Sequence, residues 1–218
     1  MHIFRCAITL HESLFFATRE LGRLYETGRY LHNYALSYAL GLARATWHQA
    51  EHIPHYAEDL SALNGQTYVT PAEPDKIHFQ LATFKYGEEE LHVEMLQATR
   101  NTPSFGRAKE IAPESSFHFY VLSAEPISLP RWIRLGKWHS KALLECEEVA
   151  WERKTGPYRA AAALNPLDLS GDVLRAFDII SMPPSSLVAN AQCYGEYYAF
   201  KENPTVGLPV GLHYNFKA

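Results

Sequence analysis

Three residues in the stretch WHQAEHIPH have the spacing of a zinc-peptidase motif. His48, Glu51 and His52 match H-x-x-E-H, and His55 adds a further imidazole nearby. On a helix the two motif histidines would lie one turn apart and could share a zinc ion. Pro54 follows two residues later and would end that helix where the ligands need a rigid frame. A polar helix end rich in histidine therefore explains the stretch better than a zinc hydrolase does, because short motifs often arise by chance.

The stretch RWIRLGKWHSK concentrates positive charge and aromatic surface in an acidic chain. It contains no acid and five potential cations: Arg131, Arg134, Lys137, His139 and Lys141. In an extended strand the last three would share one face and could meet phosphates. Trp132 and Trp138 could stack on bases, and Gly136 would let a nucleic-acid strand approach the backbone. The alternative is an edge strand protected by its lysines.

Two other basic clusters have the same composition. Arg19, Arg23 and Arg29 lie in a stretch broken by glycines, where neighbouring glutamates could instead pair with them. The segment SFGRAK reads as a projecting turn that carries Phe105 and Arg107, with an ordinary loop as the alternative. Both clusters are candidates for contact with nucleic acid, since cations and an aromatic ring together suit phosphates and bases.

The overall composition limits the class of protein. With 218 residues, 47% hydrophobic and 20% charged, the chain is typical of a folded globular protein with a substantial core. Its formal net charge of −4 differs from that of a free-standing nucleic-acid binder, which is usually basic overall. Nucleic-acid binding would therefore use a local patch, in a subunit whose remaining surface faces protein partners.

Other features exclude several classes. The sequence contains no G-x-S-x-G elbow, no Walker phosphate loop and no dinucleotide-binding fingerprint. The three cysteines are odd in number and far apart, so we expect no disulfide framework and a reducing compartment. We read no signal peptide at the N-terminus and no apolar run long enough to span a membrane.

Hydrophobic periodicity predicts the elements that would hold these clusters. An apolar stripe from Leu31 to Leu42 predicts one helix over residues 30–52, ended by Pro54. Residues 13–29 and 57–75 read as loops, residues 155–172 as a connection, and 141–152 as strand or short helix. Alternation predicts strands at 2–12, 76–87, 90–100, 117–126, 173–182 and 187–201. The pattern favours an α+β fold, with a helix packed on an antiparallel sheet.

Four segments together resemble one known family. In order along the chain they are LFFATRELGRLYETGRYLHNYALSYALG, YVTPAEP, FGRAKEIAPESSFHFYVLS and LPRWIRLGKWHSKA. They resemble the small RAMP subunit of type I-D CRISPR effector complexes, a Csc-type member of the Cas "five" family. The resemblance implies a ferredoxin-like (RRM-like) domain over 1–150 with an antiparallel sheet. It also implies an inserted β-hairpin thumb at about 76–113 and a smaller β-rich C-terminal part, 151–218.

The resemblance also implies a function. Such a subunit holds the 5′ handle of the CRISPR RNA, contacts the large subunit and the backbone RAMP subunit, and lies close to target double-stranded DNA. It is cytoplasmic and not a homo-oligomer, and it needs no cofactor. The expected RNA-binding residues are Arg19, Arg23, Phe105, Arg107, Arg134, Lys137, Trp138, His139 and Lys141.

Catalysis remains an alternative at the sequence level. Some relatives in other CRISPR subtypes cut repeat RNA, and His139 with Lys137 and Lys141 could supply the acid, the base and the phosphate-binding cation. Type I-D systems, by the resemblance, use a separate endonuclease, so we expect no enzyme activity. A zinc hydrolase that uses His48, Glu51 and His52 is the second alternative.

Overall fold

A computed structural model describes residues 1–43, 54–85 and 105–216. Its central element is a sheet in the order β4-β8-β1-β10-β9, with a further strand, β5, also paired to β8. The strands are β1 (His2–Leu10), β4 (Thr67–Val69), β5 (Glu73–Lys76), β8 (Ser116–Ser123), β9 (Trp132–Leu135) and β10 (Ser140–Glu148). All the pairings within this sheet are antiparallel, as alternation of buried and exposed residues had predicted.

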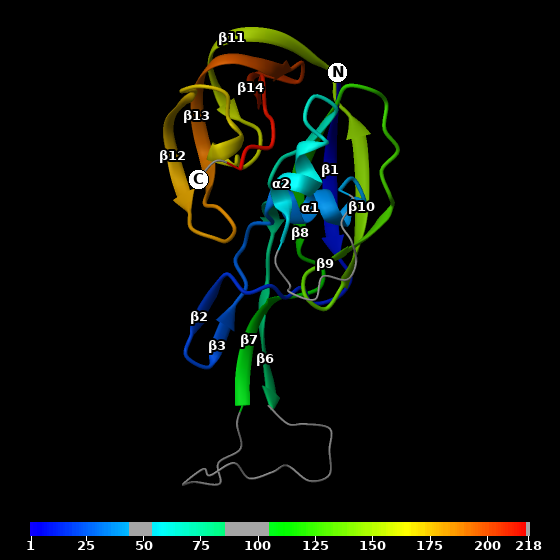
Figure 1. The fold of residues 1–218 in the computed structure, drawn as a ribbon, viewed down its shortest axis with the longest axis vertical. Helices are drawn as coiled ribbons and strands as arrows, with labels where there is room; N and C mark the ends of the chain where they lie inside the picture. Colours follow the sequence, from blue (N-terminus) through cyan, green and yellow to red (C-terminus); the bar gives the residue numbers. More distant parts are fainter. Residues whose placement is uncertain (44–53, 86–104, 217–218) are drawn as a thin grey trace.

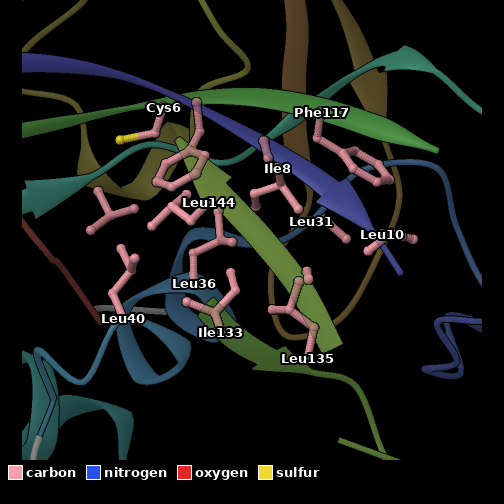
Figure 2. Packing of buried hydrophobic residues seen from close by; sticks show 14 of the residues in the cluster. Cys6, Ile8, Leu10, Leu31, Leu36, Leu40, Phe117, Ile133, Leu135 and Leu144 are labelled. Carbon is pink, nitrogen blue, oxygen red and sulfur yellow. The ribbon is translucent and has the colours of Figure 1, made fainter. Parts of the chain in front are cut away.

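One face of this sheet carries the main hydrophobic core. Ile8 on β1 and Leu144 on β10 lie opposite each other, and Phe117 on β8 packs beside them (Figure 2). Helix α1 (Asn33–Ala39) covers this face with Leu36, while Leu40 follows at its C-terminal end. The helix therefore holds the segments before and after it against the centre of the sheet.

A second sheet projects from the end of the central one. It has the order β2-β3-β7-β6 and is formed by β2 (Arg19–Leu21), β3 (Leu24–Glu26), β7 (Phe105–Ile111) and β6 (Phe79–Lys85). In Figure 1 these strands extend away from the body of the molecule. Two hairpins, far apart in the sequence, are joined here by the parallel pairing of β3 with β7.

The C-terminal part forms a third sheet in the order β11-β14-β13-β12. Its strands are β11 (Trp151–Ala160), β12 (Leu174–Ile180), β13 (Leu187–Phe200) and β14 (Asn203–Pro209), with a 3-10 turn at Pro166–Asp168. Phe200 and Leu208 from this part pack in one cluster with Ile3 and Tyr120 of the central sheet. The C-terminal part is therefore packed onto the same body.

A buried polar junction joins the same two parts. The fully buried Asp168 accepts hydrogen bonds from Tyr68 Oη (2.8 Å), Asn33 Nδ2 (2.8 Å) and the Asn215 backbone N–H (3.1 Å). Burial raises the pKa of Asp168 to about 6, although the three donors act in the opposite direction. Tyr214 adds a further contact, because its hydroxyl is hydrogen-bonded to Ser37 on α1 at 2.7 Å.

The structure corrects the predicted helix. Helix α1 stops at Ala39, and Gly41 follows it with a φ of +72°, the left-handed conformation that commonly ends helices. Residues 44–52 of the predicted helix lie outside the described residues. The Leu42 N–H then bonds to the Ser37 carbonyl at 3.1 Å, which completes the termination. A second short helix, α2 (Tyr56–Ser61), replaces part of the loop expected at 57–75, and β4 and β5 replace much of the rest.

Other predicted elements also change. The loop expected at 13–29 contains the β2–β3 hairpin, and β11 occupies the first part of the connection expected at 155–172. The segment 141–152, for which strand and short helix were both open, contains most of β10 and the start of β11, with a break at 149–150. The partner strand expected at 90–100 lies outside the described residues, and the described partner of β6 is β7. The strands predicted at 2–12, 76–87, 117–126, 173–182 and 187–201 are confirmed in place but not in their ends, as β1, β6, β8, β12 and β13; residues 86–87 lie outside the described residues.

The fold is mostly β rather than an even mixture of helix and strand. The predicted α+β class is therefore confirmed only in that the sheets are largely antiparallel. The expectation that the cysteines form no disulfide is wrong, since Cys6 and Cys146 face each other in the β1–β10 register and form a disulfide with a Cα–Cα distance of 4.2 Å. Their separation along the chain hid this pairing. No helix within the described residues is long and apolar enough to cross a membrane.

Candidate nucleic-acid interface

One face of the projecting sheet gathers cations and apolar side chains. Residues opposite each other in neighbouring strands share a face, so the register fixes its members. One row runs through Arg19, Glu26, Lys109 and Leu81, and the next through Leu21, Leu24, Arg107 and Thr83. We call this set, with Phe79, the cationic face.

The cationic face is open to solvent. Leu21 and Leu81 are each 58% exposed and Phe79 is 40% exposed. Lys109 places its ammonium 4.4 Å from the centre of the Phe79 ring and 3.5 Å from Glu26, which is the acidic member of the face. Arg19 and Arg107 bring the other positive charges, so the face combines net positive charge with exposed apolar area.

The opposite face of the same sheet is buried at its centre and exposed at its margins. Ala108 and Glu110 on β7 are buried, and Glu110 accepts a hydrogen bond from Gln80 Nε2 at 3.1 Å, whereas Gln80 and Glu20 are exposed. The backbone of Leu14 pairs with that of Ile111, so the chain leaving β1 lies along the edge of β7. The cationic face therefore belongs to a sheet anchored to the body.

The two basic clusters predicted separately meet at β3 and β7. The Arg107 backbone N–H donates to the Arg23 carbonyl at 2.8 Å, beside the turn that Gly22 makes with a φ of +62°. Arg23, in the turn between β2 and β3, and Arg107, on β7, are thus neighbours in one sheet. Phe105 begins β7, but its side chain lies outside the described residues.

The third predicted cluster is a tight hairpin rather than a continuous strand. Residues 136–139 form the turn between β9 and β10. Gly136 has a φ of +70°, and a Cβ there would lie 2.5 Å from the Phe15 carbonyl oxygen and 2.6 Å from Leu14 Cδ1. The Lys137 N–H donates to that same Phe15 carbonyl at 2.9 Å. The glycine is therefore needed for packing within the protein, which corrects the expectation that it admits a nucleic-acid strand.

The turn also changes where the predicted cations lie. Lys137 and His139 belong to the turn and Lys141 to β10, so the three do not share one strand face as expected. Arg134 contacts Glu12 at 3.3 Å and donates to the His139 carbonyl at 3.0 Å, which ties the hairpin together. Arg134 is thus partly structural, whereas Lys137 projects from the turn backbone.

The two tryptophans of the hairpin have different surroundings. Trp138 is 54% exposed and stacks on Phe15, with ring centroids 4.7 Å apart and an interplanar angle of 27°. Trp132 is 42% exposed, and the Lys141 ammonium lies 4.1 Å from the centre of its ring. Trp138 is therefore the better platform for an incoming ring. Phe15 supports it from below, and no local pattern singled this residue out.

Segment 14–18 connects all these features. Leu14 bonds to β7, Phe15 to the hairpin turn, and the Thr18 N–H to the Glu26 carbonyl at 2.8 Å on β3. The hairpin turn and the projecting sheet are consequently both held by one short stretch of chain. Because each of these contacts joins residues distant in sequence, local composition could not reveal the arrangement.

A cavity of about 390 Å³ opens beside the same segment. Its wall is mainly apolar, with Leu14, Phe16, Leu31, Tyr34, Leu135 and Met182 among its residues. His32 also lines it, and burial lowers the pKa of this imidazole to about 4, so the ring is neutral.

The zinc alternative depends on a part of the chain that is not described. The predicted zinc ligands His48, Glu51 and His52 lie outside the described residues. Within the parts of the chain that the structure describes, no group of three or more histidine, cysteine or acidic side chains could hold a metal ion.

Comparison with known proteins identifies the class and then the family. No curated protein matches the sequence. A solved chain from "Cryo-EM structure of the Type III-B Cmr-beta bound to cognate target RNA and AMPPnP, state 1" is similar, with 10% identity and a TM-score of 0.49 over 87% of this chain and 86% of that chain.

The family comparison covers residues 1–217 and matches the type I-D CRISPR-associated protein Cas5/Csc1. A match of this extent makes the protein a CRISPR effector subunit. The chain belongs to the type I-D Cas5/Csc1 family. The resemblance carried by four sequence segments is thereby confirmed.

Proposed function

We propose that this protein is the non-catalytic subunit that holds the 5′ handle of the CRISPR RNA in a type I-D effector complex. The carrying observation is that two basic clusters predicted separately occupy one solvent-facing sheet, next to a hairpin that exposes Trp138. Single-stranded RNA requires this combination, because cations neutralise phosphates and aromatic rings stack on splayed bases.

The proposal assigns each feature a part. Arg19, Arg23 and Arg107 neutralise phosphates along the projecting sheet, and Lys137 and Lys141 do so at the hairpin. Trp138 stacks on a base, with Phe105 and His139 at the two ends of the RNA path. The β6–β7 hairpin, which falls within 76–113, serves as the thumb of a ferredoxin-like domain. Residues 151–218 form an extension packed on it.

The proposed partners follow from the same assignment. The large subunit and the backbone RAMP subunit contact the surfaces that RNA leaves free, near target double-stranded DNA. An acidic total charge is compatible with this role, since only a local face meets RNA.

The salt dependence of RNA binding tests the phosphate contacts. Replacing Arg19 and Arg107 by alanine together should reduce the slope of log K against log salt by about 1.4, at about 0.7 per single-stranded phosphate contact. Fluorescence anisotropy of the purified chain with repeat-derived single-stranded RNA gives the slope. The matched control replaces Arg153 and Lys154 on β11, which already contact Glu196 and Glu152. An Arg19/Arg107 variant with the wild-type slope would contradict the proposal.

The absence of catalysis is tested separately. Repeat RNA incubated with excess protein in EDTA should remain intact, because the turn holding Lys137 and His139 serves RNA binding in this proposal. Cleavage that disappears in a His139→Ala variant would instead establish the endoribonuclease alternative.

A further inference from the structure

The apolar cavity lies at the centre of the candidate interface. Leu14 and Phe16 contribute from segment 14–18, Leu135 and Gly136 from the β9–β10 hairpin, and Ala35 from α1. It therefore borders the two elements that position the cations. Ala35 is exposed although it belongs to a helix that is otherwise largely buried, so the cavity is open to solvent at this helix.

Two cations are close in sequence to residues that line the cavity. Lys137 directly follows Gly136, and its backbone is held by the Phe15 carbonyl. Ala17 also lines the cavity, and Arg19 follows it two residues later at the start of β2. A ligand in the cavity that is joined to a negatively charged backbone would have its charges met by these two cations.

The polar groups of the wall are already engaged with each other. The Tyr34 N–H bonds to His32 Nδ1 (3.3 Å), which leaves the proton on Nε2 to donate to Ser185 Oγ (3.0 Å). Ser185 in turn donates to Asn165 Oδ1 at 3.3 Å. Because the neutral His32 has both ring nitrogens occupied, it offers the cavity a flat ring surface rather than a free donor or acceptor.

We propose that this cavity receives one unstacked base of the single-stranded RNA bound at the neighbouring cationic surface. The proposal rests on the proposed RNA-binding function and goes beyond it by assigning a base-binding site. A base has flat apolar faces that suit Phe16, Tyr34 and Tyr56, and its attached phosphates would reach Lys137 and Arg19. An apolar protein side chain would fill the cavity equally well, but it would leave these two cations unmatched.

The wall also defines the expected selectivity. Because the hydrogen-bonding groups of His32 and Ser185 are satisfied internally, the cavity should hold a base by stacking and shape. Stacking tolerates sequence, since every base has a π-face. The base position should therefore be fixed along the RNA, while the identity of the base should matter little.

A scan of abasic RNAs tests the site. Wild-type protein is titrated with single-stranded RNA of the repeat-derived 5′ sequence and with the same RNA lacking one base at each position in turn. At one position, removal of the base should weaken RNA binding about tenfold or more, because one stacked base contributes about 1–3 kcal/mol to the binding free energy. A flat profile would overturn the proposal while leaving the salt-slope test of RNA binding intact.

Filling the cavity provides the matched comparison. Ala35→Phe places a ring in the cavity from an exposed helical position, and Ala57→Phe places the same ring on α2, where residue 57 does not line the cavity. In Ala35→Phe the intact RNA should bind as weakly as the sensitive abasic RNA, and the positional effect should vanish. Ala57→Phe should keep the wild-type profile.

A measurement on unmodified protein covers the case in which Ala35→Phe fails to fold. 4-Thiouridine at the sensitive position should crosslink to peptides containing Phe16 or Tyr56. Crosslinks only to other peptides would overturn the proposal. The proposal would also be overturned if Ala35→Phe kept the wild-type response to abasic RNAs but no longer assembled with the other subunits. The cavity would then hold a protein side chain.

Discussion

The cationic face and the Asp168 junction place charged groups in opposite surroundings. On the cationic face, Arg19 and Arg107 lie on an exposed sheet, and Lys109 contacts Glu26 at 3.5 Å at its surface. At the junction, one carboxyl group is fully buried and accepts three hydrogen bonds. Solvated surface pairs contribute little to stability, whereas a buried carboxylate leaves several groups unsatisfied when it is removed. Binding and stability should therefore be separable by mutation.

The largest expected effect is at the junction. Asp168→Ala removes the acceptor for Tyr68, Asn33 and the Asn215 N–H, which should lower the free energy of unfolding by about 3–5 kcal/mol. Urea unfolding followed by circular dichroism measures the loss. The control is Asp172→Ala, whose side chain is 92% exposed and which should change stability by less than about 0.5 kcal/mol. Similar losses for both variants would remove the distinction between the two regions.

The pH dependence of stability tests the same carboxyl group. Its pKa is raised from 3.8 to about 6 by burial, so the native state binds the proton more tightly than the unfolded state. Stability should fall as pH rises from about 4 to about 6, by up to about 3 kcal/mol for this group. The difference between wild type and Asp168→Asn in urea unfolding at pH 4, 5, 6 and 7 isolates this contribution. A difference that is constant with pH would contradict the raised pKa.

The hairpin turn should respond to a single added methyl group. Gly136→Ala combines an unfavourable φ of +70° with contact against the Phe15 carbonyl, so we expect a loss of about 2 kcal/mol. Gly65→Ala is the matched variant, since its φ is +77° but nothing lies within 4 Å of its added Cβ. Thermal unfolding should show Gly136→Ala to be the less stable of the two. Equal losses of stability would mean that segment 14–18 moves to accommodate the added methyl group.

The smallest expected effect on stability is at the exposed tryptophans. Trp138→Ala should lower stability by about 1 kcal/mol, because only one face of the ring packs on Phe15. RNA binding should weaken about tenfold, as loss of one stacking platform implies. Trp132→Ala should weaken binding less, since Lys141 already lies over its ring. Anisotropy titrations of both variants decide the order, and the reverse order would move the base contact to Trp132.

Local patterns predicted the strands well and the ends of elements poorly. Alternation in β1 and β13 reflects burial of mainly one face, which short-range periodicity records directly. The predicted helix extends beyond Ala39 because the apolar stripe continues to Leu42. The positive φ of Gly41, which ends α1, has no signal in that stripe. Cys6 and Cys146 were misread because only the β1–β10 register makes them neighbours.

The candidate site was predictable in its parts and not in its assembly. Cation-rich composition pointed to Arg19, Arg107 and Lys137 without any knowledge of the fold. The β3–β7 pairing that unites the first two depends on tertiary structure and leaves no local signal. Phe15 and Ala35 were missed for the same reason, since an apolar residue becomes part of a site only through what lies beside it.

The parallel pairing of β3 with β7 also has a consequence for the order of folding. During synthesis the β2–β3 hairpin emerges long before Phe105–Ile111, the strand that it must join. Contacts of such high sequence separation form late, because a long loop must close first. The nascent chain therefore carries Arg19 and Arg23 without their complete sheet until β7 has left the ribosome, ahead of β8, β9 and β10 of the central sheet. The cationic face is incomplete until that point.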